Sequence, residues 1–337
     1  MHSIDNPAHA QPGNSTAGGQ ALRRYISRTP WVGAAISSVV VFLLFLAIAP
    51  HFSSTESLTS IAIVAAQLGI GAAGVTLLMI AGEFDLSIGS VLALTSIVAA
   101  FLASVAGLSV PLALCGAFFL AAAIGAMHAT LVLNAGIPSF IVTLGGLMFW
   151  RAMVYLISGG YPVSAPSDSL ILSWMSQRFA NGLSMGLLWS IVVLALAHWV
   201  LSSTKYGNWI YATGGNPVAA RLKGVPINRV KVALFMTTAV LACFSGLVQL
   251  GRFGTVDANR GASLELEAIA AAVIGGTSLR GGVGSVLGTV LGCLTIAMIR
   301  QGLALINMPP AVYQALLGLL LVSAVLINRG IERRTRL

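Results

Sequence analysis

Ten apolar runs, each near the length that crosses a lipid bilayer, constrain the fold of this chain most. They lie at about 31–49, 58–81, 87–106, 110–133, 137–158, 184–201, 232–251, 264–279, 283–299 and 310–327. A bilayer core requires ~20 apolar residues per helix, and lipid-exposed backbone must satisfy its own hydrogen bonds. We therefore expect an all-α, polytopic integral membrane protein with about ten transmembrane helices.

Composition excludes the main soluble classes. Only 8% of the 337 residues are charged and 57% are hydrophobic, which rules out an ordinary soluble domain. The net charge of +9 does not indicate nucleic acid, because the cations are not interleaved with aromatic residues on a soluble face. The three cysteines lie inside apolar runs and match neither a disulfide framework nor zinc spacing, so we expect no metal site.

The basic residues orient the chain. Cytoplasmic loops of membrane proteins carry an excess of Lys and Arg. An inside N-terminus places these cations inside: Arg23, Arg24, Arg28, Lys205, Arg221, Lys223, Arg229, Lys231, Arg280, Arg329, Arg333, Arg334 and Arg336. It leaves only Arg178, Arg252, Arg260 and Arg300 outside. We predict that both termini are cytoplasmic; a short, re-entrant run at 264–279 would instead place the basic C-terminus outside, and this alternative stays open.

These assignments divide the chain into three parts. Residues 1–30 are polar and predict a disordered cytoplasmic tail. Residues 31–328 form the transmembrane domain, with a cytoplasmic loop at 203–231 and outer loops at 159–183 and 252–263. Residues 329–337 form a basic cytoplasmic tail.

The loop 203–231 contains a short helix with recognisable ends. Asn216 is a favourable N-cap, Pro217 suits the first helical position, and Gly224 can adopt the left-handed conformation that ends a helix. This predicts a helix over Pro217–Lys223, with Arg221 in its last turn. So short a helix is unstable alone, so it must pack on its own membrane domain or on another protein. Alternatively, the loop is only a basic segment that fixes topology.

Charged residues interrupt the apolar runs at two places. Glu83, Asp85 and Ser87 lie between the second and third runs, and Arg151 lies inside the fifth. Charges at membrane depth usually face a pathway, a partner or water, so all four are candidates for a translocation pathway. The alternatives are that Asp85 or Ser87 only caps the third helix, and that Arg151 reaches the headgroups or pairs with an acid.

The ninth run carries glycines at four-residue intervals. Gly284, Gly288 and Gly292 are predicted to lie on one helix face, where another backbone can approach closely.

The chain lacks an ATPase motif. The sequence has no Gly-Lys dipeptide, and therefore no phosphate-binding loop of the ATPase type. We expect no enzymatic activity from this chain itself.

Three segments together resemble a known family. Residues 82–90 (GEFDLSIGS), 215–224 (GNPVAARLKG) and 267–282 (EAIAAAVIGGTSLRGG) resemble the permease subunit of bacterial ABC importers of the ribose, xylose and galactose type. The similarity extends from Trp31 to Arg329. One departure is Glu83-Phe84, where the family more often has Gly followed by an aliphatic residue.

The resemblance implies a multi-subunit importer in the bacterial inner membrane. This chain would form the pathway for a monosaccharide or polyol, beside a second permease copy or a paralogue and among membrane lipids. A cytoplasmic ABC ATPase would bind ATP and Mg, no cofactor would bind here, and a periplasmic sugar-binding protein would dock on Arg178, Arg252 and Arg260. The resemblance makes the short helix a coupling helix that contacts the ATPase through Asn216, Pro217, Val218, Ala219, Arg221, Leu222, Lys223 and Gly224. The rival function is an ion-coupled secondary transporter of a small polar solute, which would use Glu83, Asp85 and Arg151.

Overall fold

Long helices make up most of the chain in a computed structural model, which describes residues 31–166, 174–175, 177, 179 and 184–335. The ten principal helices are α2 (Trp31–Ile48), α3 (Thr55–Ile80), α4 (Ile88–Ser104), α5 (Val110–Asn134), α6 (Ser139–Ser158), α8 (Met185–Ser203), α11 (Ile227–Phe253), α12 (Leu264–Ile274), α13 (Val286–Leu305) and α14 (Pro310–Thr335). Two further helices, α9 (Lys205–Gly215) and α10 (Pro217–Leu222), connect α8 to α11. The predicted tail at residues 1–30 and Arg178 lie outside the described residues.

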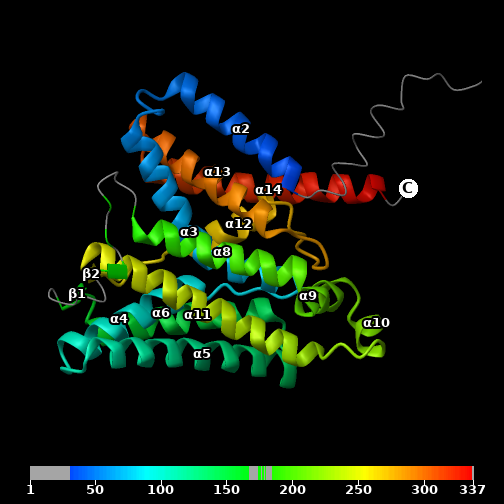
Figure 1. Ribbon diagram of the computed structural model, residues 1–337, viewed down its shortest axis with the longest axis horizontal. Coiled ribbons are helices and arrows are strands. Elements are labelled where there is room, and N and C mark those ends of the chain that lie inside the picture. The colour runs from blue at the N-terminus through cyan, green and yellow to red at the C-terminus, as the bar shows by residue number, and fades with distance from the viewer. Residues whose placement is uncertain (1–30, 167–173, 176, 178, 180–183, 336–337) are drawn as a thin grey trace, which may run out of the picture.

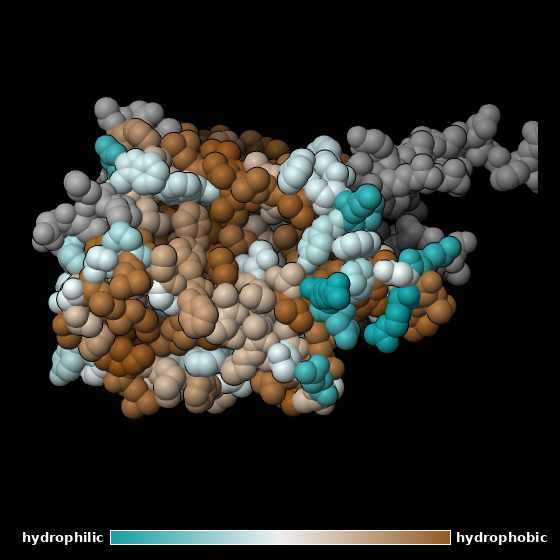
Figure 2. All heavy atoms as spheres, turned by 60° about the horizontal axis from the view of Figure 1, so that its bottom comes forward, coloured by the Kyte–Doolittle hydropathy of each residue, from teal (hydrophilic) through white to brown (hydrophobic). Residues whose placement is uncertain are grey.

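The helices run side by side between two ends of the molecule (Figure 1). Strands β1 (Val163–Ser164) and β2 (Thr255–Val256) lie at one end, which we call the β end, and α9 and α10 lie at the other, the α10 end. The strands pair antiparallel and join the two predicted outer loops, a small departure from the all-α expectation. Hydrophilic side chains gather at the α10 end, whereas apolar side chains cover much of the face between the ends (Figure 2).

Seven of the described helices are long and apolar enough to cross a membrane: α2, α3, α5, α6, α8, α11 and α13. Helix α4 and the first part of α14 are apolar but shorter. Helices α3 and α4 are largely buried and pack against α11, whereas α2, α5, α6 and α8 expose large apolar side chains as lipid-facing helices do. The prediction of a mostly helical, polytopic membrane protein is confirmed.

One predicted helix end is wrong, and another helix extends beyond its apolar run. The eighth run was expected to be helical to residue 279, but α12 ends at Ile274, where Gly275 and Gly276 follow and Gly276 has a left-handed φ of 85°. Its 11 residues span ~16 Å, about half of a bilayer core. Helix α14 continues past the tenth apolar run through Thr335, so the predicted basic tail at 329–337 begins within a helix.

The predicted glycine seam on α13 holds for two of its three members. A Cβ atom at Gly288 would lie 1.9 Å from the carbonyl oxygen of Gly275, and one at Gly292 would lie 2.0 Å from that of Ala271. These glycines therefore let α13 meet the backbone of α12 directly. Gly284 does not share this face, because α13 begins only at Val286 and Gly284 packs instead against the side chain of Ile80.

Candidate functional site

Helix α10 has the ends that its sequence predicts, and the observed C-terminal boundary is one residue earlier. The Asn216 side chain accepts a hydrogen bond from the Ala219 backbone N–H at 3.0 Å. Gly224 has a φ of 81°, and its N–H donates to the Arg221 carbonyl while the Val225 N–H donates to that of Ala220. This pair of bonds is the Schellman motif, which satisfies carbonyls at the helix end. The short helix is therefore rigidly bracketed on both sides.

An apolar face of α10 is exposed at the α10 end. Val218 is 73% exposed and Leu222 is 85% exposed, whereas Ala220 between them is buried. Residues four apart lie on the same side of a helix, so the two large apolar side chains form one exposed ridge. Arg221 and Lys223 are exposed beside it. The helix packs on its own domain only through its opposite side, and the ridge is available to another protein.

The base of α10 meets two other segments at a junction of glycine backbones. A Cβ atom at Gly214 would lie 1.9 Å from the Ile80 carbonyl oxygen and 2.7 Å from the Gly282 nitrogen, and Gly282 itself donates to that Ile80 oxygen at 2.8 Å. Tyr211 fastens the same junction, because its hydroxyl donates to the Gly284 carbonyl at 2.9 Å. Burial raises the pKa of Tyr211, so this hydroxyl keeps its proton. The end of α3, the end of α9 and the α12–α13 loop are thus held together.

An ion pair joins this junction to the start of α11. The Glu83 carboxylate accepts a hydrogen bond from the Lys231 ammonium group, and their side chains are only 11% and 18% exposed. Glu83 follows Gly82, which contacts Gly281 across the junction. Glu83, a pathway candidate, therefore has a structural partner. Its ion pair with Lys231 holds the start of α11 against the glycine junction.

Asp85 and Ser87 lie in the buried segment that leads into α4. Asp85 is 1% exposed, and its Oδ1 accepts hydrogen bonds from the backbone N–H of Ser87 at 2.8 Å and from its hydroxyl at 2.6 Å. Ser87 occupies the N-cap position, but its side chain makes no capping bond to α4. The Ser87 side chain therefore does not cap α4, whereas Asp85 accepts the backbone N–H of the residue just before the helix. Ser139 holds the same segment by accepting a hydrogen bond from the Phe84 N–H at 3.1 Å.

His128, which the sequence analysis did not single out, lies near this segment. It is fully buried on α5, and its Nε2 accepts a hydrogen bond from the Trp150 indole at 3.2 Å. A Cβ atom at Gly146 would touch both the His128 ring and Ser87. Within the described part of the chain, neither His128 Nδ1 nor Asp85 Oδ2 has a hydrogen-bond partner. A lone histidine inside an apolar run was the available sequence signal.

A polar cavity of about 500 Å³ opens near the β end, between α3, α11, α12, α13 and the loop after β2. Its polar lining residues are Ser60, Gln67, Gln249, Arg252, Asp257, Asn259, Arg260, Glu267, Arg300 and Gln301. None of the four predicted pathway residues lines this cavity. The arginines of the outer loops were predictable from the sequence, whereas the amides and Glu267 lie scattered within apolar runs and carry no such signal.

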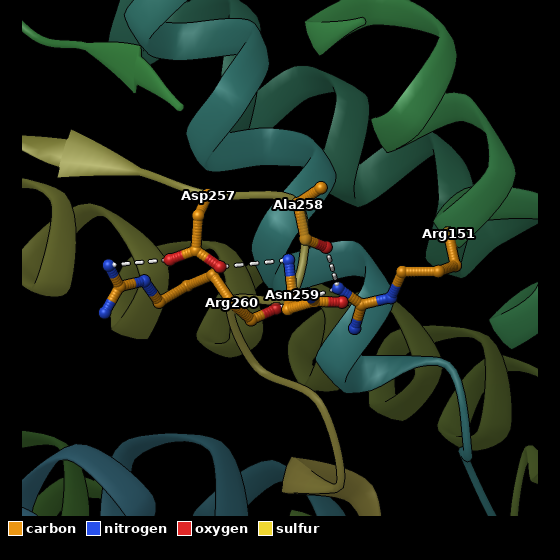
Figure 3. A network of polar contacts seen from close by, with 5 residues as sticks. All are labelled: Arg151, Asp257, Ala258, Asn259 and Arg260. Atoms are coloured by element: carbon orange, nitrogen blue, oxygen red, sulfur yellow. Dashed lines mark hydrogen bonds and ion pairs between the residues drawn. The ribbon is translucent and has the colours of Figure 1, made fainter. Parts of the chain in front are cut away.

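Arg151 holds the loop after β2, which forms one wall of the cavity, without lining the cavity itself. Its guanidinium group donates to the carbonyl oxygens of Ala258 at 2.7 Å and Arg260 at 2.9 Å (Figure 3). Asp257 holds the same turn by accepting from the Asn259 N–H and by pairing with Arg260 at 3.0 Å. The two expected alternatives for Arg151 were contact with lipid headgroups and an ion pair with an acidic side chain. In the structure its guanidinium group binds two backbone carbonyl oxygens instead.

The predicted docking arginines Arg252 and Arg260 both line the cavity and lie against Phe253, at 5.0 and 4.4 Å from its ring centre. They are half-buried rather than projecting. Their use by a partner stays a prediction. Among the described residues, no group of three or more His, Cys, Asp or Glu side chains could hold a metal ion.

Comparison with known proteins assigns the family. Residues 57–325 match the family described as branched-chain amino acid transport system / permease component. The chain belongs to this permease family. It is 32% identical over 317 residues to the ribose import permease RbsC of Escherichia coli (strain K12), covering 91% of this chain and 96% of the relative.

Other permeases match over similar lengths. The probable ABC transporter permease YphD of E. coli (strain K12) is 34% identical over 320 residues, 94% of each chain. The fructose import permease FrcC of Rhizobium meliloti is 30% identical over 324 residues, 93% of this chain and 89% of that relative. No solved structure matches. The family resemblance is confirmed, the chain is an inner-membrane ABC permease, and the ion-coupled transporter is rejected.

Proposed function

We propose that this permease carries a monosaccharide or related polyol across the inner membrane as one subunit of a binding-protein-dependent importer. The relatives named for ribose and fructose import support this substrate class. A separate ATPase binds ATP and Mg, and a second permease copy or a paralogue completes the membrane part. The observation that carries the mechanism is the exposed ridge of Val218 and Leu222 on a helix capped at both ends.

The α10 end faces the cytoplasm in this proposal, and the β end faces the periplasm. The loop and helix ends near α10 carry Lys205, Arg221, Lys223, Arg229, Lys231 and Arg280, whereas the described loop and helix ends near the β end carry only Arg252, Arg260 and Arg300. The positive-inside rule favours this orientation.

Ten crossings fit the same proposal. Although α12 is short, the chain after it does not turn back to the β end, because Gly281 and Gly282 contact Gly82, Gly214 and Gly215 at the α10 end. Helix α12 and the non-helical segment 275–285 together reach the α10 end, which favours a full crossing over a re-entrant one. An even number of crossings returns both termini to the cytoplasm.

Nucleotide-driven movement of the ATPase passes to the membrane through α10. The ridge inserts into an apolar groove on the ATPase, and the glycine junction at the base of α10 transfers the displacement to α3, to the α12–α13 loop and to the segment carrying Asp85. Close backbone contact suits this task, because it leaves no flexible side chain between the moving parts.

Leu222→Asp tests this coupling. A carboxylate in an apolar groove costs several kcal/mol unless it is paired, so the variant should insert normally but lose copurification of the ATPase and binding-protein-stimulated ATP hydrolysis. Leu222→Met is the matched control, because it keeps the volume and the apolar character, and it should retain both. A second variant inserts glycine after Ala220 to weaken the helix. Full assembly and sugar uptake in both Leu222→Asp and the insertion variant would reduce the loop to a topological anchor.

A further inference from the structure

We propose that the polar cavity at the β end is a monosaccharide-binding site of the permease itself, with Glu267 as its principal acceptor of sugar hydroxyl hydrogen bonds. The inference rests on the proposed function, and it assigns a site that the sugar occupies after leaving the binding protein. It differs from the predicted pathway residues, since Glu83, Asp85, Ser87 and Arg151 do not line this space.

Glu267 is a buried carboxylate held in place at the cavity wall. It lies in the first turn of α12, and the Tyr313 hydroxyl donates to its Oε1 at 2.7 Å. Arg300 approaches the same oxygen at 3.9 Å, and its guanidinium lies 5.8 Å from the Tyr313 ring centre. Both of these described contacts use Oε1, and Glu267 lines the cavity, so Oε2 is left for a ligand. A fixed carboxylate with one oxygen available suits the recognition of a hydroxyl group.

The other lining groups complement a neutral polyhydroxylated ligand. Gln67, Gln249, Asn259 and Gln301 present both donors and acceptors, which hydroxyl groups also do. Gln301 is already oriented, because its Oε1 accepts from the Ser60 hydroxyl at 3.0 Å. The cavity volume of about 500 Å³ falls within the range of ~300–1,000 Å³ that is usual for small-molecule sites.

The charges in the cavity favour a sugar over an anion. Two of its three arginines already face carboxylates, Arg260 beside Asp257 and Arg300 beside Glu267. The three arginines and two carboxylates of the lining leave a net formal charge of only +1, so the cavity lacks the strong positive field that favours an anion. A neutral ligand needs no such field and can use the amides and both carboxylates.

Protection of an introduced cysteine tests the site directly. Ala304→Cys, at a cavity-lining position whose side chain makes no hydrogen bond to the sugar, is made in a Cys115→Ser background that removes the exposed native thiol. The protein is treated with a small water-soluble thiol reagent while ribose, fructose or phosphate is titrated. Cys243 and Cys293 are buried and stay in place. At a sugar concentration about ten times the dissociation constant, labelling should slow about tenfold, because only the empty site reacts. Glu56→Cys, at the exposed start of α3 and outside the cavity, is the control and should label equally with and without sugar.

Removing the carboxylate should then weaken the protection. Glu267→Gln in the Ala304→Cys protein should raise the protecting sugar concentration about tenfold or more, as expected for loss of one hydrogen bond to a charged group. Tyr313→Phe, which keeps the ring beside Arg300, should raise it less. ATPase copurification through α10 is measured in parallel, so that a failed cavity is distinguished from a failed importer.

Three results would overturn the proposal. These are labelling of Ala304→Cys that neither sugar slows, protection by phosphate instead of sugar, and protection that is unchanged in a folded Glu267→Gln protein. Sugar protection is measured first with Glu267 intact. Its absence would refute the site whether or not the Glu267→Gln protein folds.

Discussion

The ion pair between Glu83 and Lys231 gives the sharpest prediction about how α10 is connected to the membrane domain. Both side chains are mostly buried, so removing one partner leaves the other charge poorly solvated. Breaking a buried pair in this way costs ~3–5 kcal/mol, and partial exposure of this pair places it at or below the lower figure. Removing both charges leaves no uncompensated charge. Glu83→Gln and Lys231→Met should therefore each destabilise the protein more than the double variant does.

The assay is the midpoint of thermal unfolding in detergent for the wild type, both single variants and the double variant. We expect both single variants to unfold at lower temperature than the double variant, with non-additivity of ~1 kcal/mol or more. Sugar uptake per ATP hydrolysed should fall in the single variants, because the junction at the base of α10 loosens. The exchanged variant, Glu83→Lys with Lys231→Glu, should recover part of both properties. Additive effects in the double variant, or single variants with wild-type stability, would refute the role assigned to this pair.

Three further predictions concern close approach, burial and surface charge. Gly214→Ala should abolish the folded protein, because its Cβ atom would lie 1.9 Å from a carbonyl oxygen. The control Gly145→Ala on α6, which has nothing within 4 Å, should give normal yield. Size-exclusion chromatography in detergent measures both yields, and a folded Gly214→Ala protein would contradict the close backbone contact at this junction. Asp85→Cys should resist a small aqueous thiol reagent in the conformation described here and react when ATP is trapped on the ATPase; labelling independent of state, with transport intact in Asp85→Ala, would remove this residue from the pathway. Reversal of Arg252 and Arg260 to Glu should slow binding-protein-stimulated ATP turnover more at low than at high salt, and equal slowing would exclude electrostatic docking.

Local features of the fold were predictable from the sequence. The ends of α10 follow from Asn216, Pro217 and Gly224, because helix caps depend only on neighbouring residues. The long apolar helices follow from run length in the same way. The early end of α12 was also signalled, by Gly275 and Gly276, but the apolar run continued past them and concealed it.

The contacts that define the candidate sites could not be predicted. Glu83 and Lys231 are 148 positions apart, and neither apolar periodicity nor charge spacing pairs them. The cavity could not be predicted for the same reason, because its lining residues come from four helices and a loop that meet only after packing. Arg151 also found its partners in a distant turn, where backbone carbonyls carry no sequence signature. These features depend on tertiary packing, whereas caps and span lengths do not.

The central claim, that α10 is the contact with the ATPase, is tested most directly by photo-crosslinking in the assembled transporter. A photoreactive amino acid is placed at Leu222 on the exposed ridge and, in a separate protein, at Tyr161, which is 76% exposed near the β end. The account predicts an adduct with the ATPase from position 222 and none from position 161, where an adduct with the binding protein is expected instead. An ATPase adduct from position 161, or none from position 222 in a complex that hydrolyses ATP, would contradict it.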